Sequence, residues 1–269
     1  MATKEHRTDV LSRLANATAE APVRLGRYDV VACIGKGGMG TVYDALDREH
    51  GNARVALKML SLLDGQGLVQ LKHEFRSMAD VTHENLVSLY ELACHHDLWF
   101  FTMERIDGHS WVRHVRGEDE PSPHSQSKVS RPDEPTREIA VSADDAPDEE
   151  RPPLLGERIS DATLARLRPA FAQLVRGVHA LHQRGLVHLD LKPANVLVQA
   201  DGRVVILDFG LVRSAQDHSG GAGAKGTLMY MAPEQMSGEP VSEPADWYAV
   251  GVMLYRALTG RRPFVGKEP

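Results

Sequence analysis

Two polar loops, each set between apolar segments, constrain this chain most. Residues 187–198 read Val-His-Leu-Asp-Leu-Lys-Pro-Ala-Asn-Val-Leu-Val, and residues 206–210 read Ile-Leu-Asp-Phe-Gly. The apolar residues on either side are typical of short strands, so two Asp, one Lys and one Asn are expected in the loops between them. Carboxylate and amide oxygens suit a hard cation such as magnesium, and an ammonium group suits phosphate. The two loops together can hold a divalent metal, a polyphosphate and a hydroxyl nucleophile.

The composition is that of a globular protein, and it excludes several classes. The chain has 269 residues, 42% of them hydrophobic and 25% charged, which is enough for one large domain or two small lobes sharing a cleft. A net charge of −6 gives no support for nucleic-acid binding. Cys33 and Cys94 lie in apolar, strand-like surroundings and are predicted to be small core residues in a reducing compartment. No run of 18 apolar residues and no apolar signal-peptide core is found, so we expect a cytoplasmic chain without a membrane span.

The hydrophobic pattern predicts how the chain is organised. Residues 1–25 are polar with a short amphipathic pattern, which predicts a flexible leader or one loose helix, and we favour the flexible leader. Ser160 or Asp161 can cap a strongly amphipathic helix that begins at Ala162. Strands are predicted over 28–34, 41–46, 54–60, 86–94 and 98–103, and helices over 68–81, 162–183 and 246–259.

Residues 117–157 differ from the rest of the chain. They contain twelve acidic and four basic residues, seven prolines and no aromatic residue. Such a segment buries too little apolar surface to offset the entropy of ordering it. We therefore predict a disordered acidic insert, which is either a solvated linker or a docking segment for a basic partner.

A glycine-rich segment precedes a predicted strand. Residues 35–40 read Gly-Lys-Gly-Gly-Met-Gly, and glycines let backbone amides approach phosphate oxygens closely. A dinucleotide-binding Rossmann motif requires a helix directly afterwards, whereas the β-rich residues Thr-Val-Tyr follow here. The pattern therefore favours a strand–loop–strand cover over phosphates, with an ordinary glycine hairpin as the alternative.

A lysine ends the next apolar strand. Residues 55–58 read Val-Ala-Leu-Lys, and Lys58 at the strand's end can reach phosphate oxygens. A surface lysine on an edge strand is the alternative. Glu74, on the helix predicted over 68–81, is the candidate ionic partner of Lys58.

In this order and at this spacing, the segments resemble those of eukaryotic-type (Hanks-type) serine/threonine protein kinases, with a bacterial-like pattern, over about residues 28–266 without the insert. The resemblance implies an α+β, two-lobed fold, with an N-lobe of antiparallel β-sheet plus one helix over 26–103. The hinge and a mainly helical C-lobe would follow over 104–269. The family continues for several helices beyond the equivalent of Pro269, so the resemblance implies an incomplete C-lobe.

The implied activity is magnesium-dependent phosphoryl transfer from ATP to Ser or Thr hydroxyls of a protein substrate. Asp190 would accept the hydroxyl proton, Lys192 would stabilise charge on the γ-phosphate, and Asn195 and Asp208 would hold magnesium. Thr227 would hydrogen-bond to Asp190 and Lys192, and the Lys58–Glu74 ion pair would position the phosphates. The residues implied to bind the nucleotide are Ile34, Gly35, Lys36, Gly37, Gly38, Met39, Gly40, Thr41, Val42, Ala56, Lys58, Glu104, Ile106 and Leu197.

The resemblance also implies supporting roles. His188 would be a packing residue, and Asp246 would anchor the backbone of the loop that carries Asp190. Met103 would be the gatekeeper beside the adenine slot, and Glu234 would pair with an arginine further along the family's fold. Lys192, together with Gly-Thr at 226–227, favours Ser and Thr substrates over Tyr.

One residue departs from the family pattern in a way that bears on regulation. Leu189 stands where most members carry an arginine that pairs with a phosphorylated residue. We therefore expect activity that needs no phosphorylation of the loop between Gly210 and Thr227, where only Ser214 and Ser219 are candidates. Ala194 also makes arginine-rich substrates less favoured. The alternative to an enzyme is a pseudokinase-like, nucleotide-binding module of a larger signalling protein.

Overall fold

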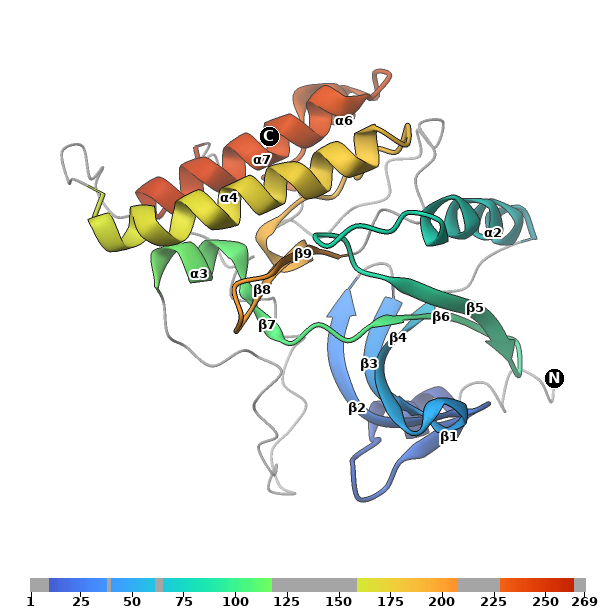
Figure 1. The fold of residues 1–269 in the computed structure, drawn as a ribbon. Coiled ribbons are helices and arrows are strands. Elements are labelled where there is room, and N and C mark those ends of the chain that lie inside the picture. The colour runs from blue at the N-terminus through green and yellow to red at the C-terminus, as the bar shows by residue number, and fades with distance from the viewer. Residues whose placement is uncertain (1–9, 38–39, 61–64, 118–158, 208–227, 264–269) are drawn as a thin grey trace, which may run out of the picture. The chain divides into compact units, whose positions relative to one another are not determined.

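The computed structural model describes residues 10–37, 40–60, 65–117, 159–207 and 228–263. The chain divides into two compact units (Figure 1). Unit 1 comprises Met1–Thr82 and Val87–Ile106, and unit 2 comprises His83–Leu86 and Asp107–Pro269. The acidic segment 117–157, apart from Gly117, lies outside the described residues, as does the loop that carries Ser214 and Ser219.

Unit 1 is built on an antiparallel sheet of six strands, in the order β1-β2-β3-β4-β6-β5. All five strands predicted from the sequence are present, with shifted ends. The strands are β1 (Val23–Leu25), β2 (Tyr28–Gly37), β3 (Gly40–Asp47), β4 (Ala53–Leu60), β5 (Leu89–His95) and β6 (Leu98–Glu104). Helix α2 (Gly65–Ala79) is the longest helix in the described part of unit 1.

Strands β2 and β3 lie on either side of the glycine-rich segment and pair antiparallel, in the strand–loop–strand order that was predicted. Gly37 pairs with Gly40, and Gly35 pairs with Val42 in the same ladder. Gly40 has φ +141°, and a Cβ there would overlap the carbonyl oxygen of Met59 on β4. Only glycine fits this position, because the neighbouring strand approaches the backbone directly. A strand follows the glycines where a Rossmann motif would have a helix.

The N-terminal segment is not a flexible leader where it is described. Residues 10–15 are helical, and Leu14 is completely buried. Val10 and Ala17 join Leu14 in the apolar core of unit 1. Of the two alternatives predicted for this segment, the helix is therefore present over residues 10–15. Burial of its apolar face in the core of unit 1 stabilises this helix.

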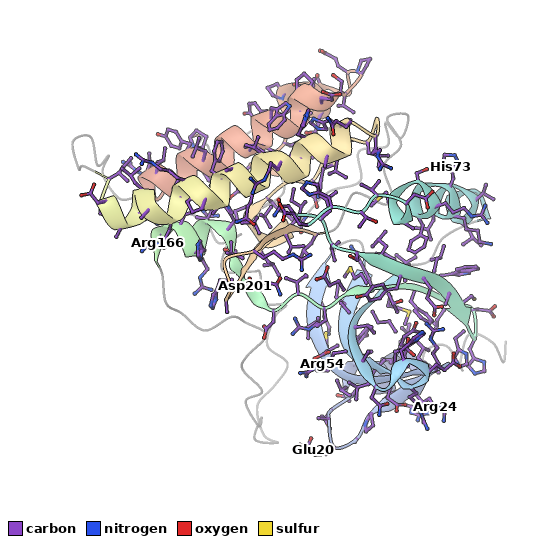
Figure 2. All side chains as sticks on the ribbon, viewed as in Figure 1. Glu20, Arg24, Arg54, His73, Arg166 and Asp201 are labelled. Atoms are coloured by element: carbon purple, nitrogen blue, oxygen red, sulfur yellow. The ribbon has the colours of Figure 1, made fainter. Side chains whose placement is uncertain are left out.

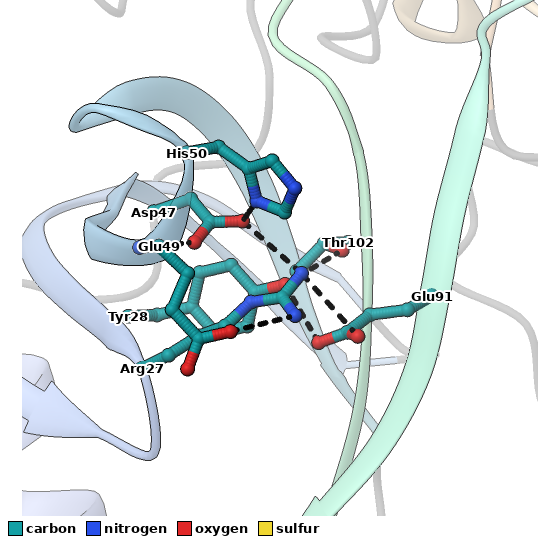
Figure 3. Close-up of polar contacts among 7 residues, drawn as sticks. All are labelled: Arg27, Tyr28, Asp47, Glu49, His50, Glu91 and Thr102. Atoms are coloured by element: carbon teal, nitrogen blue, oxygen red, sulfur yellow. Dashed lines mark hydrogen bonds and ion pairs between the residues drawn. The ribbon is translucent and has the colours of Figure 1, made fainter.

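The core of unit 1 is aromatic and aliphatic, and Tyr28 connects it to a polar network (Figure 3). The Tyr28 ring lies edge-on to Phe100, and its hydroxyl donates to Glu91 over 2.6 Å. Burial, and then the bond to Glu91, raise the pKa of Tyr28 to about 12. Cys33 is partly buried against this core, but Cys94 is exposed, so the prediction of a core position for Cys94 is wrong. Cys94 lies close to the turn between β5 and β6, where the alternation of the strand no longer fixes burial.

Asp47 is the centre of the same network. Its carboxylate accepts from His50 Nδ1 at 2.9 Å and from the Glu49 N–H at 3.1 Å, and it lies 3.1 Å from the Arg27 guanidinium. Burial alone would raise the pKa of Asp47, but these hydrogen bonds and the nearby positive charge outweigh it and hold the pKa below its usual value. The cluster fixes the turn between β3 and β4.

Unit 2 is mainly helical with a small sheet of three strands, in the order β7-β8-β9. Helix α4 runs over the predicted residues, and the Ser160 hydroxyl accepts from the Thr163 N–H, so Ser160 is its N-cap. Helix α7 begins three residues earlier than predicted, with Pro244 in its first turn. The elements are β7 (Gly108–Ser110), α3 (Trp111–Arg116), α4 (Asp161–His182), η3 (Pro193–Asn195), β8 (Val196–Gln199), β9 (Val204–Ile206), α6 (Pro233–Ser237) and α7 (Glu243–Thr259).

Short elements of unit 2 are held by side chains from distant parts of the chain. Asn85 is completely buried, and its Nδ2 donates to Val204 O at 2.8 Å and to Gln173 Oε1 at 3.0 Å. Arg166 of α4 donates to Val115 O at the end of α3, over 3.1 Å (Figure 2). Within the described residues, no helix has the length and apolar character needed to cross a membrane.

Candidate functional site

The side chain of Asp190 is held on one oxygen only. Its Oδ2 lies 3.2 Å from Lys192 Nζ and accepts from Asn195 Nδ2 at 3.0 Å. The same Asn195 amide donates to the Asp190 carbonyl at 2.8 Å. The other oxygen, Oδ1, is buried and takes no hydrogen bond from the part of the chain that the structure describes. The sequence-predicted residues Asp190, Lys192 and Asn195 are thus brought together.

The His188 side chain hydrogen-bonds to both polar loops. It is 1% exposed, its Nε2 lies 2.8 Å from Leu207 O, and its Nδ1 lies 3.2 Å from the Asp190 N–H. The Asp190 N–H is the donor to Nδ1, so the proton on Nε2 is donated to the Leu207 carbonyl. The Leu207 N–H in turn donates to Asn195 O at 2.8 Å. His188 is buried as predicted, and it also connects the Asp190 loop to the residue that precedes Asp208.

Asp246, in the first turn of α7, holds the loop that carries Asp190 by its backbone. Its Oδ2 accepts from the His188 N–H and its Oδ1 from the Leu189 N–H, both at 2.8 Å. His182 Nε2 lies 2.8 Å from the same Oδ2. The predicted anchoring role of Asp246 is confirmed. Leu189 has φ +61°, a left-handed conformation that is uncommon for a residue with a side chain.

Sequence reasoning missed two residues of this arrangement. His182 gives Asp246 its third polar contact, and Gln235 of α6 donates from Nε2 to the Leu189 carbonyl at 3.0 Å. His182 lies four residues after Val178, on the apolar face of α4, and a polar residue on a buried face was the available signal. Nothing in the sequence around Gln235 indicates its partner, because the contact joins residues 46 positions apart.

Lys58 lies in unit 1 on β4, between strands β3 and β6 of the sheet. Lys58 is 6% exposed, pairs with Val42 on β3 and Phe101 on β6, and its Nζ lies 5.9 Å from the centre of the Phe101 ring. An exposed edge-strand position is therefore excluded. Glu74 lies in α2, but its side chain is outside the described part, so the Lys58–Glu74 ion pair stays a prediction.

The residues predicted for the adenine slot lie in both units. Ala56 pairs with Met103, and both are buried, while Ile34, Val42 and Leu197 are partly exposed. Leu197 belongs to β8 of unit 2, and the others belong to unit 1.

Two backbone groups within residues 104–106 already have hydrogen-bond partners in the chain. The Glu104 N–H donates to Ser88 O at 2.8 Å, and the Arg105 guanidinium donates to Ile106 O. Arg105 also lies 3.8 Å from Asp44, which is buried on β3 and pairs with Arg54 at 2.9 Å. The Glu104 N–H and the Ile106 carbonyl therefore already have partners within the chain.

Several predicted residues cannot be placed. Gly38, Met39, Asp208 and Thr227 lie outside the described residues, whereas Gly35, Lys36, Gly37, Gly40 and Thr41 lie in β2 and β3. Within the described ranges, no group of three or more His, Cys, Asp and Glu side chains is arranged to hold a metal ion. Because Asp208 is not among them, this leaves the predicted Asn195–Asp208 pair untested.

Comparison with known proteins agrees with this architecture. The protein kinase domain family matches residues 28–134 and 148–269. A probable serine/threonine-protein kinase of Streptomyces coelicolor is 31% identical over 262 residues, covering 93% of this chain and 33% of that protein. The DNA damage-responsive serine/threonine-protein kinase RqkA of Deinococcus radiodurans is 33% identical over 247 residues, covering 90% of this chain and 31% of that protein. The chain thus spans about a third of the length of these relatives.

A solved structure shares the fold. The kinase domain of Mycobacterium tuberculosis PknI superposes with a TM-score of 0.59 at 21% identity, covering 92% of this chain and 81% of that domain. The α+β kinase-like fold expected from the motifs is therefore confirmed. With the family match extending over most of the chain, the chain belongs to the protein kinase domain family.

Proposed function

We propose that the chain transfers the γ-phosphoryl group of ATP to Ser or Thr hydroxyls of a protein substrate. The observation that carries the proposal is the asymmetry at Asp190. One carboxylate oxygen is fixed by Lys192 and Asn195, and the other is buried without a donor among the described residues. A carboxylate held in this way offers its second oxygen to a substrate hydroxyl at a fixed position.

The side chains of unit 2 would then act together on the hydroxyl and the phosphate. Asp190 Oδ1 would accept the hydrogen bond of the attacking hydroxyl and then its proton, which orients the oxygen for in-line attack. Lys192 Nζ would neutralise charge on the transferred group. Burial of His188 and its bonds to both loops would keep the two loops in register during transfer.

The cofactor fits the donor set that can be placed. The Asn195 amide points its Nδ2 at Asp190, which leaves its Oδ1 as the end available to a cation. Asn195 and Asp208 would hold magnesium, which supplies charge neutralisation to the phosphates when bound. Lys58 and the backbone of the glycine hairpin would bind phosphate oxygens, and Ala56, Val42 and Leu197 would contact the adenine.

The test compares phosphate transfer by wild type with that by Asp190→Asn. Transfer of radiolabelled phosphate from ATP to a generic protein substrate is expected in wild type and should fall at least about a hundredfold in Asp190→Asn. Asp201→Asn, the same change in the exposed turn between β8 and β9, is the control and should stay within about twofold of wild type.

Nucleotide binding, measured by calorimetry, separates the proposal from its alternative. Asp190→Asn should bind nucleotide as wild type does, because the change removes the proton acceptor and keeps its shape. Binding by both proteins with no transfer by wild type would contradict the proposed activity and favour a pseudokinase-like, nucleotide-binding module.

We also propose that activity does not require phosphorylation between Gly210 and Thr227. The proposal rests on Leu189, whose side chain cannot pair with a phosphate. Replacing both Ser214 and Ser219 by Ala should leave the rate of transfer unchanged, and near-complete loss would overturn the proposal.

A further inference from the structure

The backbone at Leu189 is held from both sides by residues of two other elements. Its N–H donates to Asp246 of α7 at 2.8 Å, and its carbonyl accepts from Gln235 of α6 at 3.0 Å. Leu189 directly precedes Asp190, so these two bonds fix the peptide groups next to the residue proposed to accept the proton. All these residues belong to unit 2.

The conformation of Leu189 explains why two bonds are needed. A leucine at φ +61° is strained relative to the ordinary right-handed or extended conformations. Such a conformation persists only where the surroundings over-determine it. Asp246 fixes the peptide before Leu189. The peptide after it is held by Gln235 at the Leu189 carbonyl and by the His188 ring at the Asp190 N–H.

We infer that Gln235 is a positioning residue that holds the loop carrying Asp190 in its strained conformation. Its two ends have different partners: Nε2 donates to Leu189 O, and Oε1 accepts from the Ala232 N–H at the start of α6, at 3.1 Å. One planar amide therefore couples the position of α6 to the conformation of the loop. The inference that Gln235 affects catalysis rests on the proposed function, but the inference that Gln235 holds the loop does not.

The simpler alternative is that Gln235 serves only as a helix cap. Ala232 is the N-cap of α6, and a glutamine at the third helical position commonly accepts from the N-cap N–H. Glutamate is equally suited to this cap, but it cannot donate to a carbonyl when ionised. Gln235→Glu thus keeps the cap and removes the bond to Leu189.

The experiment measures hydrogen–deuterium exchange of the intact chain in peptides that cover residues 186–195. Gln235→Glu should speed exchange in this segment about five- to tenfold, the effect of losing one hydrogen bond, while the melting temperature changes little. Gln183→Glu, the same change at the exposed end of α4, is the matched control and should exchange as wild type does. Gln235→Met, which removes both bonds, should also speed exchange and should lower the melting temperature.

Activity gives a second readout. For Gln235→Glu, kcat should fall about tenfold with KM for ATP within twofold, because the misplaced group is the proton acceptor. Unchanged exchange in both Gln235 variants would overturn the inference that Gln235 holds the loop. Faster exchange with unchanged kcat would overturn the positioning role. If wild type transfers no phosphate, the proposed function fails, and exchange alone still decides whether Gln235 holds the loop.

Discussion

The Asp246 side chain makes three polar contacts that hold the loop carrying Asp190. It is 1% exposed and takes the His188 N–H, the Leu189 N–H and the His182 ring on its two oxygens. Removing an acceptor from several buried donors leaves each of them unsatisfied, which costs more than the bonds themselves contribute.

At this residue we predict that Asp246→Asn lowers the free energy of unfolding by about 2–4 kcal/mol. The amide keeps the shape of the carboxylate but presents an NH₂ group to a donor N–H. Urea unfolding followed by circular dichroism measures the change. Glu243→Gln is the control, since Glu243 is largely exposed and lies 3.7 Å from His182, and it should cost less than about 0.5 kcal/mol. Equal effects of the two substitutions would contradict this role for Asp246.

Some single residues were predictable from the sequence and others were not. Asp190, Lys192 and Asn195 lie within six positions of one another, so their grouping follows from local chain geometry. Gln235 and His182 act on partners more than 40 positions away, and only the tertiary fold defines such contacts.

Among the elements, the helical turn at residues 10–15 and strand β1 extend unit 1 beyond the boundary expected at residue 26. Leu14 is completely buried in the core that also contains Leu25 and Tyr28. Most of the stability of a helix in a protein comes from packing of its apolar face, so the structure of these residues depends on this burial.

For this segment we predict that Leu14→Ala destabilises unit 1 by about 2–5 kcal/mol, the usual range for a buried leucine. Hydrogen exchange of peptides from β1, β2 and β3 should rise, because they share the core with Leu14. Leu11→Ala, one turn away and only partly buried, should have a clearly smaller effect. Unchanged exchange in Leu14→Ala would show that the segment is not part of the folded unit.

The long elements were predicted well and the short ones poorly. Helix α4 repeats its apolar residues over six turns, whereas α3, β7 and α6 have six residues or fewer. In such short pieces, neither a period of 3.6 nor one of 2 can be recognised. Their structure comes from tertiary contacts, such as the Arg166 side chain at the end of α3.

On the scale of the whole molecule, the two units are stabilised by polar networks of different kinds. In unit 2, the network centred on Asp246 uses backbone donors of a loop. In unit 1, Asp47 combines the charge of Arg27 with hydrogen bonds from His50 and the Glu49 N–H. Salt and pH should therefore act on the two units unequally, even though the whole chain carries a modest net charge of −6.

We predict that Asp47→Asn destabilises unit 1 by about 1–2 kcal/mol at pH 7, and that the difference from wild type fades in acid. The pKa of Asp47 is lower in the folded chain than in the unfolded one, so its contribution is complete above the unfolded value near 4. As the pH falls through the folded pKa, the wild-type carboxyl becomes protonated and its stabilising contribution is lost. The variant has no such contribution at any pH, so the two free energies of unfolding converge.

Urea unfolding with pulsed hydrogen exchange reads the peptides of each unit separately and checks this at pH 7 and pH 3. Arg27, Glu49, His50 and Glu91 surround Asp47 and are the same residues in both proteins. Asp29→Asn is the control, because Asp29 is more exposed and lies 3.8 Å from its partner Arg48. It should give a small difference at both pH values. A difference for Asp47→Asn that is as large at pH 3 as at pH 7 would contradict a stabilising role for the ionised carboxylate, since that role must disappear once the group is protonated.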